Sequence, residues 1–162
     1  MATGLDTDRA AWQIADKFSG FGTLLFVSGM KSVLGFGRLF TARERAEAEG
    51  EMAVSTPVLE LSGAYLSIQK WLDLCSRKRV VLGLDAEVAV LGYARGWSPR
   101  PEFCLAIRRM QDVAIWLEGE LRVYHLPRTS TPIQICDCIS RQEMAEAMRL
   151  CQATFGVPLE MV

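Results

Sequence analysis

Four acidic residues stand at points where the sequence pattern changes between expected strands and expected helices. Asp16 closes a strand, Glu60 lies in the first turn of a long helix, Asp85 ends an apolar strand, and Asp137 opens the last helix. Each is next to apolar sequence, so each carboxylate is expected at the border of a core. Metal-dependent phosphodiester enzymes need several carboxylates around two ions about 3.5–4 Å apart, and Mg²⁺ prefers oxygen ligands. If the four converge, they have the chemistry for such a site.

The elements that must position these carboxylates alternate between strands and helices. Three strands come first, and the short Gly-containing turns between them indicate antiparallel neighbours. A five-turn helix then leads to a continuous apolar strand, and such a crossover indicates parallel pairing with an earlier strand. The expected strands are 11–15, 22–27, 32–40, 79–85 and 120–127, and the expected helices are 58–74, 86–95, 101–118 and 137–154. Segments 41–57 and 128–134 are expected to be solvated connections. This order predicts an α/β fold: a mixed five-stranded sheet, three antiparallel strands then two parallel ones, flanked by helices.

The composition is that of an ordinary globular protein, with 162 residues, 50% hydrophobic and 23% charged. It predicts a single domain over 1–162 and excludes collagen and long disorder. The net charge of -1 means that any nucleic-acid binding must use a local basic patch. Five cysteines without a C-x-x-C pair fit neither a disulfide framework nor a four-thiolate zinc site, which favours a reducing, intracellular compartment: cytoplasm, nucleus or organelle matrix. No apolar run approaches the roughly 20 residues of a membrane span.

Four segments together resemble the ribonuclease H domain of retroelement reverse transcriptases, of the DIRS and gypsy types. They are ADKFSGFGTLL at 15–25, TPVLELSGAYLSIQKW at 56–71, VVLGLDAEVAVLGYARGWSP at 80–99 and YHLPRTSTPIQICDCISR at 124–141. Segment 15–25 is similar to the family's strand ending in Asp, followed by S/T-G-x-G, and segment 56–71 is similar to its N-x-L-E-L-x-A helix. Segment 80–99 resembles the family's strand ending in Asp before a short helix and G-x-S. Segment 124–141 resembles the closing pattern H-x-P-G…N-x-x-A-D-x-L-S-R.

The resemblance implies a ribonuclease H-like fold and hydrolysis of the RNA strand of an RNA–DNA hybrid with Mg²⁺ or Mn²⁺. The family's four metal-binding carboxylates fall on Asp16, Glu60, Asp85 and Asp137, the same four that the strand ends indicate. The chain also departs from the family pattern at three places. The family usually has small residues after the first Asp. It has Asn or Ser after the third Asp, and it has Gly in the closing segment. The residues at those positions are Lys17, Phe18, Ala86 and Arg128.

These departures keep a second hypothesis open, in which the domain has lost catalysis. It would then be a structural or RNA-binding subunit of a larger ribonucleoprotein or organellar assembly, with other protein subunits as partners. Three of the four carboxylates also have a structural alternative: Asp16 as a turn cap, Glu60 at the positive end of its helix, and Asp137 as an N-cap. A proofreading exonuclease using Asp85 and Glu87 is a third, less favoured hypothesis, because that D-x-E pair normally lies on the first strand.

Other chemically capable residues have structural or solvent-facing interpretations. His125, the single histidine, is interpreted as structural at the end of the last strand. Seven aromatic residues are expected in the core, although Trp97 could instead stack on a sugar or base. They are Trp12, Phe18, Phe21, Trp71, Tyr93, Trp97 and Trp116. Cys136 and Cys138 are interpreted as small apolar residues. A basic group in the middle of the chain is interpreted as a solvated face that could follow phosphates. It comprises Arg77, Lys78, Arg79, Arg95, Arg100, Arg108 and Arg109.

Overall fold

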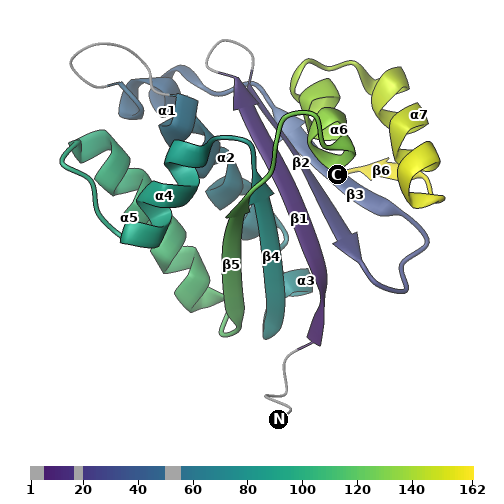
Figure 1. Cartoon of the computed structure of the whole chain (residues 1–162), viewed down its shortest axis with the longest axis horizontal. Helices are drawn as coiled ribbons and strands as arrows, with labels where there is room; N and C mark the ends of the chain where they lie inside the picture. The colour runs from purple at the N-terminus through teal and green to yellow at the C-terminus, as the bar shows by residue number, and fades with distance from the viewer. Residues whose placement is uncertain (1–5, 17–19, 50–55) are drawn as a thin grey trace.

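A computed structural model describes residues 6–16, 20–49 and 56–162, without the side chains of residues 6–8 and 16. Figure 1 shows a twisted sheet with helices on both faces. The strands are β1 (Asp6–Asp16), β2 (Gly20–Val27), β3 (Val33–Arg38), β4 (Lys78–Leu84), β5 (Glu120–His125) and β6 (Leu159–Met161). The helices are α1 (Ala42–Glu47), α2 (Thr56–Lys70), α3 (Leu72–Cys75), α4 (Glu87–Arg95), α5 (Pro101–Trp116), α6 (Thr131–Ser140) and α7 (Met144–Phe155).

The sheet has the strand order β5-β4-β1-β2-β3-β6. β1, β2 and β3 pair antiparallel, whereas β4 pairs parallel with β1 and β5 pairs parallel with β4. This confirms the expected mixed sheet, including the parallel pairing after the helical crossover. The sixth strand was not expected: β6 adds three residues parallel to β3, next to a backbone hydrogen bond from Val33 N to Pro158 O.

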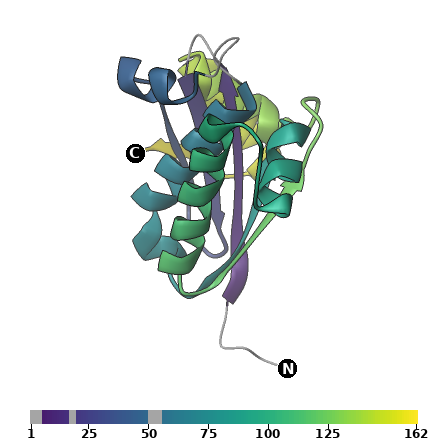
Figure 2. The same cartoon turned by 90° about the vertical axis from the view of Figure 1, so that its left-hand side faces the viewer.

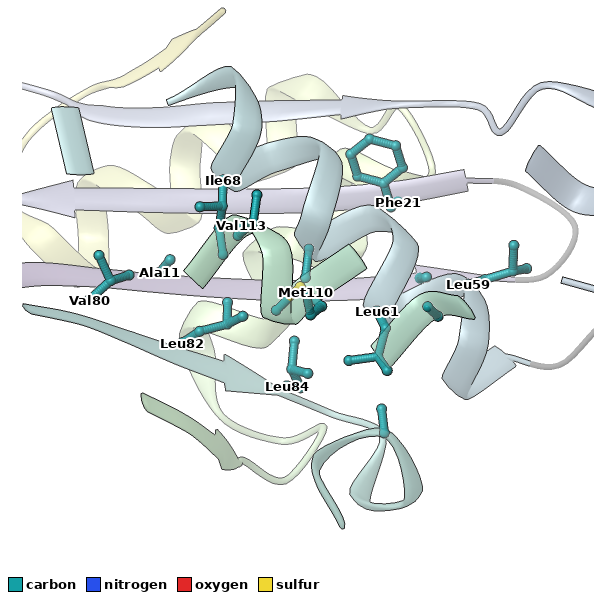
Figure 3. Packing of buried hydrophobic residues seen from close by; sticks show 14 of the residues in the cluster. Ala11, Phe21, Leu59, Leu61, Ile68, Val80, Leu82, Leu84, Met110 and Val113 are labelled. Atoms are coloured by element: carbon teal, nitrogen blue, oxygen red, sulfur yellow. The ribbon is translucent and has the colours of Figure 1, made fainter. Parts of the chain in front are cut away.

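Two hydrophobic cores lie on opposite faces of the sheet. The larger one lies between the sheet and helices α2, α4 and α5, where Met110 of α5 meets apolar residues of β4 such as Leu82 (Figure 3). In the turned view of Figure 2, α2 and α5 run side by side along the strands. The smaller core holds α6 and α7 against β1, β2 and β3. The strands alternate accordingly, since Ala11 and Ala15 face the larger core and Ile14 faces the smaller one.

Glycine lets α2 approach the sheet closely. A Cβ on Gly63 would lie 2.4 Å from Gln13 Nε2 and 3.0 Å from the Phe21 side chain, so a larger residue there would push the helix outward. This close contact fixes the position of α2, one turn beyond Glu60.

Three expectations about the elements were wrong. The supposed connection 41–57 contains α1, which starts with a capping box: Glu44 N donates to Thr41 Oγ1, and Thr41 N donates to the Glu44 carboxylate. The long helix after Pro57 ends at Lys70, and α3 follows as a separate turn. The final helix also starts earlier than expected, at Thr131 within the supposed loop 128–134.

The final helix is in addition broken into α6 and α7. Gln142 has a left-handed φ of 62°, its N–H donates to Ile139 O, and Glu143 N donates to Cys138 O. These two hydrogen bonds make a Schellman motif, which ends a helix by satisfying its last carbonyls. The motif usually contains Gly at the left-handed position, and Gln142 gives no such signal in the sequence.

All five cysteines are free thiols. Within the described ranges 6–16, 20–49 and 56–162, no helix is long and apolar enough to cross a membrane.

Candidate active site

The carboxyl ends of β1, β4 and β5 lie together at one edge of the sheet, because these three strands run in the same direction (Figure 1). In the parallel pairing of β1 with β4, Gln13 lies opposite Leu84. Asp16 therefore ends β1 on the same edge where Asp85 follows β4. The side chain of Asp16 lies outside the described residues, so only its backbone position is placed.

Glu60 connects α2 to this edge. Its carboxylate accepts hydrogen bonds from the backbone N–H of Asp85 at 2.9 Å and of Ala86 at 3.1 Å. Ala86 is the N-cap of α4 and contributes no side-chain hydrogen bond of its own, so Glu60 satisfies amides at the start of that helix. The alternative interpretation, in which Glu60 serves its own helix, does not account for these two contacts.

Glu60 is almost completely buried, with 1% of its surface exposed. Burial raises the pKa of Glu60 to about 8, and the negative charge of Asp85 adds to the rise. The hydrogen bonds from Asp85 and Ala86 and the positive charge of Arg128 oppose it. A buried carboxylate of this kind favours the approach of positive charge.

Asp85 is paired with an arginine from another part of the chain. Arg128 Nε lies 3.4 Å from Asp85 Oδ2, with the Asp85 side chain 22% exposed and the Arg128 side chain 62% exposed. Arg128 belongs to the connection from β5 to α6. The connection is held at its start by a hydrogen bond from Leu126 N to Leu84 O, the residue before Asp85.

Asp137 does not open a helix as expected. It is the seventh residue of α6, because the helix already starts at Thr131 with Pro132 in its first turn, a position that proline tolerates. Its interpretation as an N-cap is therefore wrong. The Asp137 side chain is 24% exposed and pairs with Arg141 one turn later, at 3.3 Å, while Ser140 Oγ donates to the Asp137 carbonyl.

Close packing places α6 against the β1–β2 hairpin. A Cβ on Gly22 would lie 2.1 Å from Cys136 O and 2.8 Å from Ser140 N, and the Cys136 thiol donates to Trp12 O. Burial raises the pKa of Cys136 well above its usual value, and the charges of Glu60 and Asp137 raise it further. Both carboxylates therefore act on the same buried thiol.

The four carboxylates thus differ in how closely the structure brings them together. Glu60 is in direct contact with Asp85 through a backbone hydrogen bond, whereas Asp137 lies on α6, which packs on the opposite face of the sheet from α2. Among the side chains that the structure describes, no three His, Cys, Asp or Glu residues form a group able to hold an ion. Asp16 is outside that set. In chemistry, carboxylate oxygens without histidine or thiolate fit a hard divalent cation.

Sequence reasoning missed the two arginines beside these carboxylates. Arg141 could have been found from its spacing, since residues four apart on a helix are neighbours. Arg128 had no such signal, because its partner Asp85 is far away in the sequence. Trp97 is 61% exposed, as a stacking residue requires, but the expectation that Trp116 lies in the core was wrong, since it is 48% exposed. His125 closes β5 and is exposed.

Known proteins match this chain in structure and not in sequence. No family model matches the sequence, and no curated protein matches it. Among solved structures, ribonuclease H1 from the halophilic archaeon Halobacterium salinarum aligns with a TM-score of 0.60 at 12% identity, over 85% of this chain and 98% of that one. The N-terminal ribonuclease H domain of a Mycobacterium tuberculosis protein, solved as a fusion with maltose-binding protein, aligns with a TM-score of 0.56 at 15% identity, over 87% and 97%.

The chain has the ribonuclease H fold. The two alignments cover 85% and 87% of the chain, and so most of the mixed sheet and its helices. At this level of identity the likeness concerns the fold, and the activity has to be argued from the residues at the carboxyl edge.

Proposed function

We propose that residues 1–162 form one metal-dependent ribonuclease H domain that cleaves the RNA strand of RNA–DNA hybrids. The observation that carries the proposal is the contact between Glu60 and the backbone of Asp85, at the edge of a ribonuclease H fold where β1 ends in Asp16. The family resemblance and the strand-end pattern of the sequence both indicate these residues, and the contact between Glu60 and Asp85 supports two of them. The retroelement origin and an intracellular location belong to this proposal as well, and they rest on the sequence alone.

Asp16, Glu60, Asp85 and Asp137 would hold Mg²⁺ or Mn²⁺. Two such ions supply activation of the attacking water and stabilisation of the leaving 3′ oxygen. The chain's own contribution is to hold the ligands before the cation binds. Glu60 is fixed by two backbone amides, Asp85 by the end of β4, and Asp137 by a helix that packs on Gly22. Positions fixed in this way need little rearrangement on binding.

Recognition of a hybrid would depend on its shape and on contacts to 2′-hydroxyl groups in the wide minor groove. The exposed Trp97 and the exposed Arg95 and Arg100 lie in and after α4, the helix that Glu60 joins to the site edge. They are the side chains we propose for stacking and for phosphate contacts.

One observation favours the second candidate, a non-catalytic structural or RNA-binding subunit. Arginines neutralise both Asp85 and Asp137, which is the pattern expected where carboxylates have only a structural role. Such a subunit would still bind RNA or protein partners through the same fold but would cleave nothing.

Cleavage of end-labelled substrates by the purified chain separates the two candidates. The substrates are an RNA–DNA hybrid, single-stranded RNA, duplex RNA and duplex DNA, each with Mg²⁺ or Mn²⁺ and with chelator. We expect cleavage of the RNA strand of the hybrid, dependent on the metal and lost in Asp85→Asn. Glu87→Gln is the matched control, because Glu87 is exposed two residues further along. Binding of the hybrid without cleavage by the folded wild type would support the subunit instead.

A further inference from the structure

We propose that Arg128 is a built-in counter-ion that competes with the divalent cation for Asp85 and so sets the cation concentration at which the site fills. This inference rests on the proposed function, because it assumes that Asp85 is a cation ligand. Arg128 would be a positioning residue and not a catalytic one.

The connection that carries Arg128 crosses the candidate site. It leaves β5, is tied to Leu84 by the hydrogen bond from Leu126 N, and enters α6 at Thr131. In Figure 1 this connection passes over β4 and β1 on its way to α6. It therefore spans the space between Asp85 at the end of β4 and Asp137 on α6. A second backbone bond, from Ser130 N to Pro127 O, forms a turn around Arg128 and limits where its side chain can reach.

The two partners have unequal access to solvent. Asp85 has 22% of its side chain exposed and is held beside the buried Glu60, whereas Arg128 is 62% exposed on a loop. The carboxylates cannot move away from the edge, but the guanidinium can swing into solvent. The ion pair can therefore break by movement of Arg128 into solvent while Asp85 stays in place.

The contact has the strength of a replaceable ion pair. It is a single contact of 3.4 Å from Nε, in contrast to the two-point contact of Arg38 with Glu44 at 2.7 and 2.8 Å. Exposed single pairs contribute little to stability, so a divalent cation can displace the guanidinium. Until it does, the positive charge of Arg128 balances the carboxylate of Asp85.

Arg128 must therefore weaken cation binding, by occupying Asp85 and by repelling a second positive charge. Removing the charge in Arg128→Gln should tighten Mn²⁺ binding by about three- to tenfold at low ionic strength. The difference in Mn²⁺ affinity between Arg128→Gln and the wild type should become smaller as salt screens the charge of the guanidinium. Arg128→Lys keeps the charge and should restore an affinity close to that of the wild type.

Isothermal titration calorimetry of the metal-free chain of 162 residues with Mn²⁺ alone tests the effect of Arg128 on cation binding without any activity assay. Arg149→Gln is the matched control, since Arg149 is 66% exposed and also paired with a glutamate, on the distant helix α7. We expect tighter binding in Arg128→Gln and not in Arg149→Gln. In the Asp85→Asn background the gain from Arg128→Gln should be smaller, because only the charge repulsion is left to remove. Circular dichroism confirms that each variant is folded.

The outcomes separate this inference from the proposed function. Equal Mn²⁺ affinity in wild type and Arg128→Gln would overturn the inference and leave the metal site standing. Binding by Arg128→Gln but not by wild type would support the inference while contradicting catalysis by the natural chain. No binding by any variant would overturn both.

Discussion

The most unusual residue in the structure is Glu60, an acidic side chain that is 1% exposed and accepts hydrogen bonds from two backbone amides. A second acid, Asp85, lies beside it, so desolvation and the charge of Asp85 both disfavour the ionised form of Glu60 and raise its pKa to about 8. Sequence reasoning singled out Glu60 and Asp85 from their positions beside apolar runs, and their role in a metal site stays a prediction. It could not predict that Glu60 accepts hydrogen bonds from the backbone after β4, because Glu60 and Asp85 are 25 residues apart in the sequence.

The raised pKa of Glu60 makes the stability of the metal-free protein depend on pH. The folded chain holds a proton on Glu60 up to about pH 8, whereas the unfolded chain loses it near its ordinary value of 4.5. The folded state thus binds more protons than the unfolded state between those values. The stability from this group is full below the lower value and is lost as pH rises to about 8, at roughly 1.4 kcal/mol per pH unit.

Glu60→Gln cannot titrate and should remove this contribution to the pH dependence. The measurement is urea unfolding with chelator from about pH 5 to pH 8, where the difference in stability between variant and wild type should move in favour of the variant as pH rises. Glu87→Gln is the same substitution at an exposed position. Parallel pH profiles for Glu60→Gln and wild type would show that Glu60 is already ionised in the folded protein.

At the scale of elements, the packing of α2 and α6 on opposite faces of the sheet decides where Glu60 and Asp137 lie. The sequence predicted β4, α4 and α5 closely, because β4 is a continuous apolar run and Gly96 and Gly119 mark where the two helices stop. It failed where the signal was present but unused. Thr-Pro at 131–132 marks a helix start as it does at 56–57, and Thr41 with Glu44 is a capping box.

Gly22 holds α6 close to the hairpin, and a methyl group there would collide with the backbone of that helix. Gly22→Ala should cost about 3 kcal/mol by forcing α6 outward, and it should lower cleavage by displacing Asp137. The comparison is Gly29→Ala, where nothing lies within 4 Å of the added methyl and only the positive φ of 85° is strained, at about 1 kcal/mol. If urea unfolding gave equal losses of stability for Gly22→Ala and Gly29→Ala, the position of α6 would not depend on the close contact at Gly22.

Met110 anchors α5 in the larger core and is fully buried (Figure 3). Met110→Ala removes apolar contacts and leaves a cavity, so it should cost about 3 kcal/mol in urea unfolding. Met148 is 52% exposed on α7, and Met148→Ala should change stability by no more than about 0.5 kcal/mol. A similar small loss for both variants would show that α5 packs more loosely than its burial indicates.

At the scale of the whole molecule, the fold brings residues 16, 60 and 85 to one edge of the sheet and packs α6, which carries Asp137, against the β1–β2 hairpin. Parallel β1 and β4 do this for Asp16 and Asp85, α2 adds Glu60, and the hairpin contact adds α6 with Asp137. The sheet order could be predicted because turn lengths and crossover lengths determine strand direction. The β3–β6 pairing and the contact of Arg128 with Asp85 could not, because three-residue strands and loop side chains leave no periodic pattern.

The central claim is that four carboxylates act as one metal site on an RNA–DNA hybrid. The most direct test is single-turnover cleavage of one labelled hybrid by the wild type, Asp16→Asn, Glu60→Gln, Asp85→Asn and Asp137→Asn, with Glu87→Gln as control. The account predicts that each of the four substitutions lowers the rate by about a hundredfold or more, while the control stays near the wild type. Full activity in any of the four would contradict the shared site, and a wild type that cleaves no better than Asp85→Asn would contradict the enzyme itself.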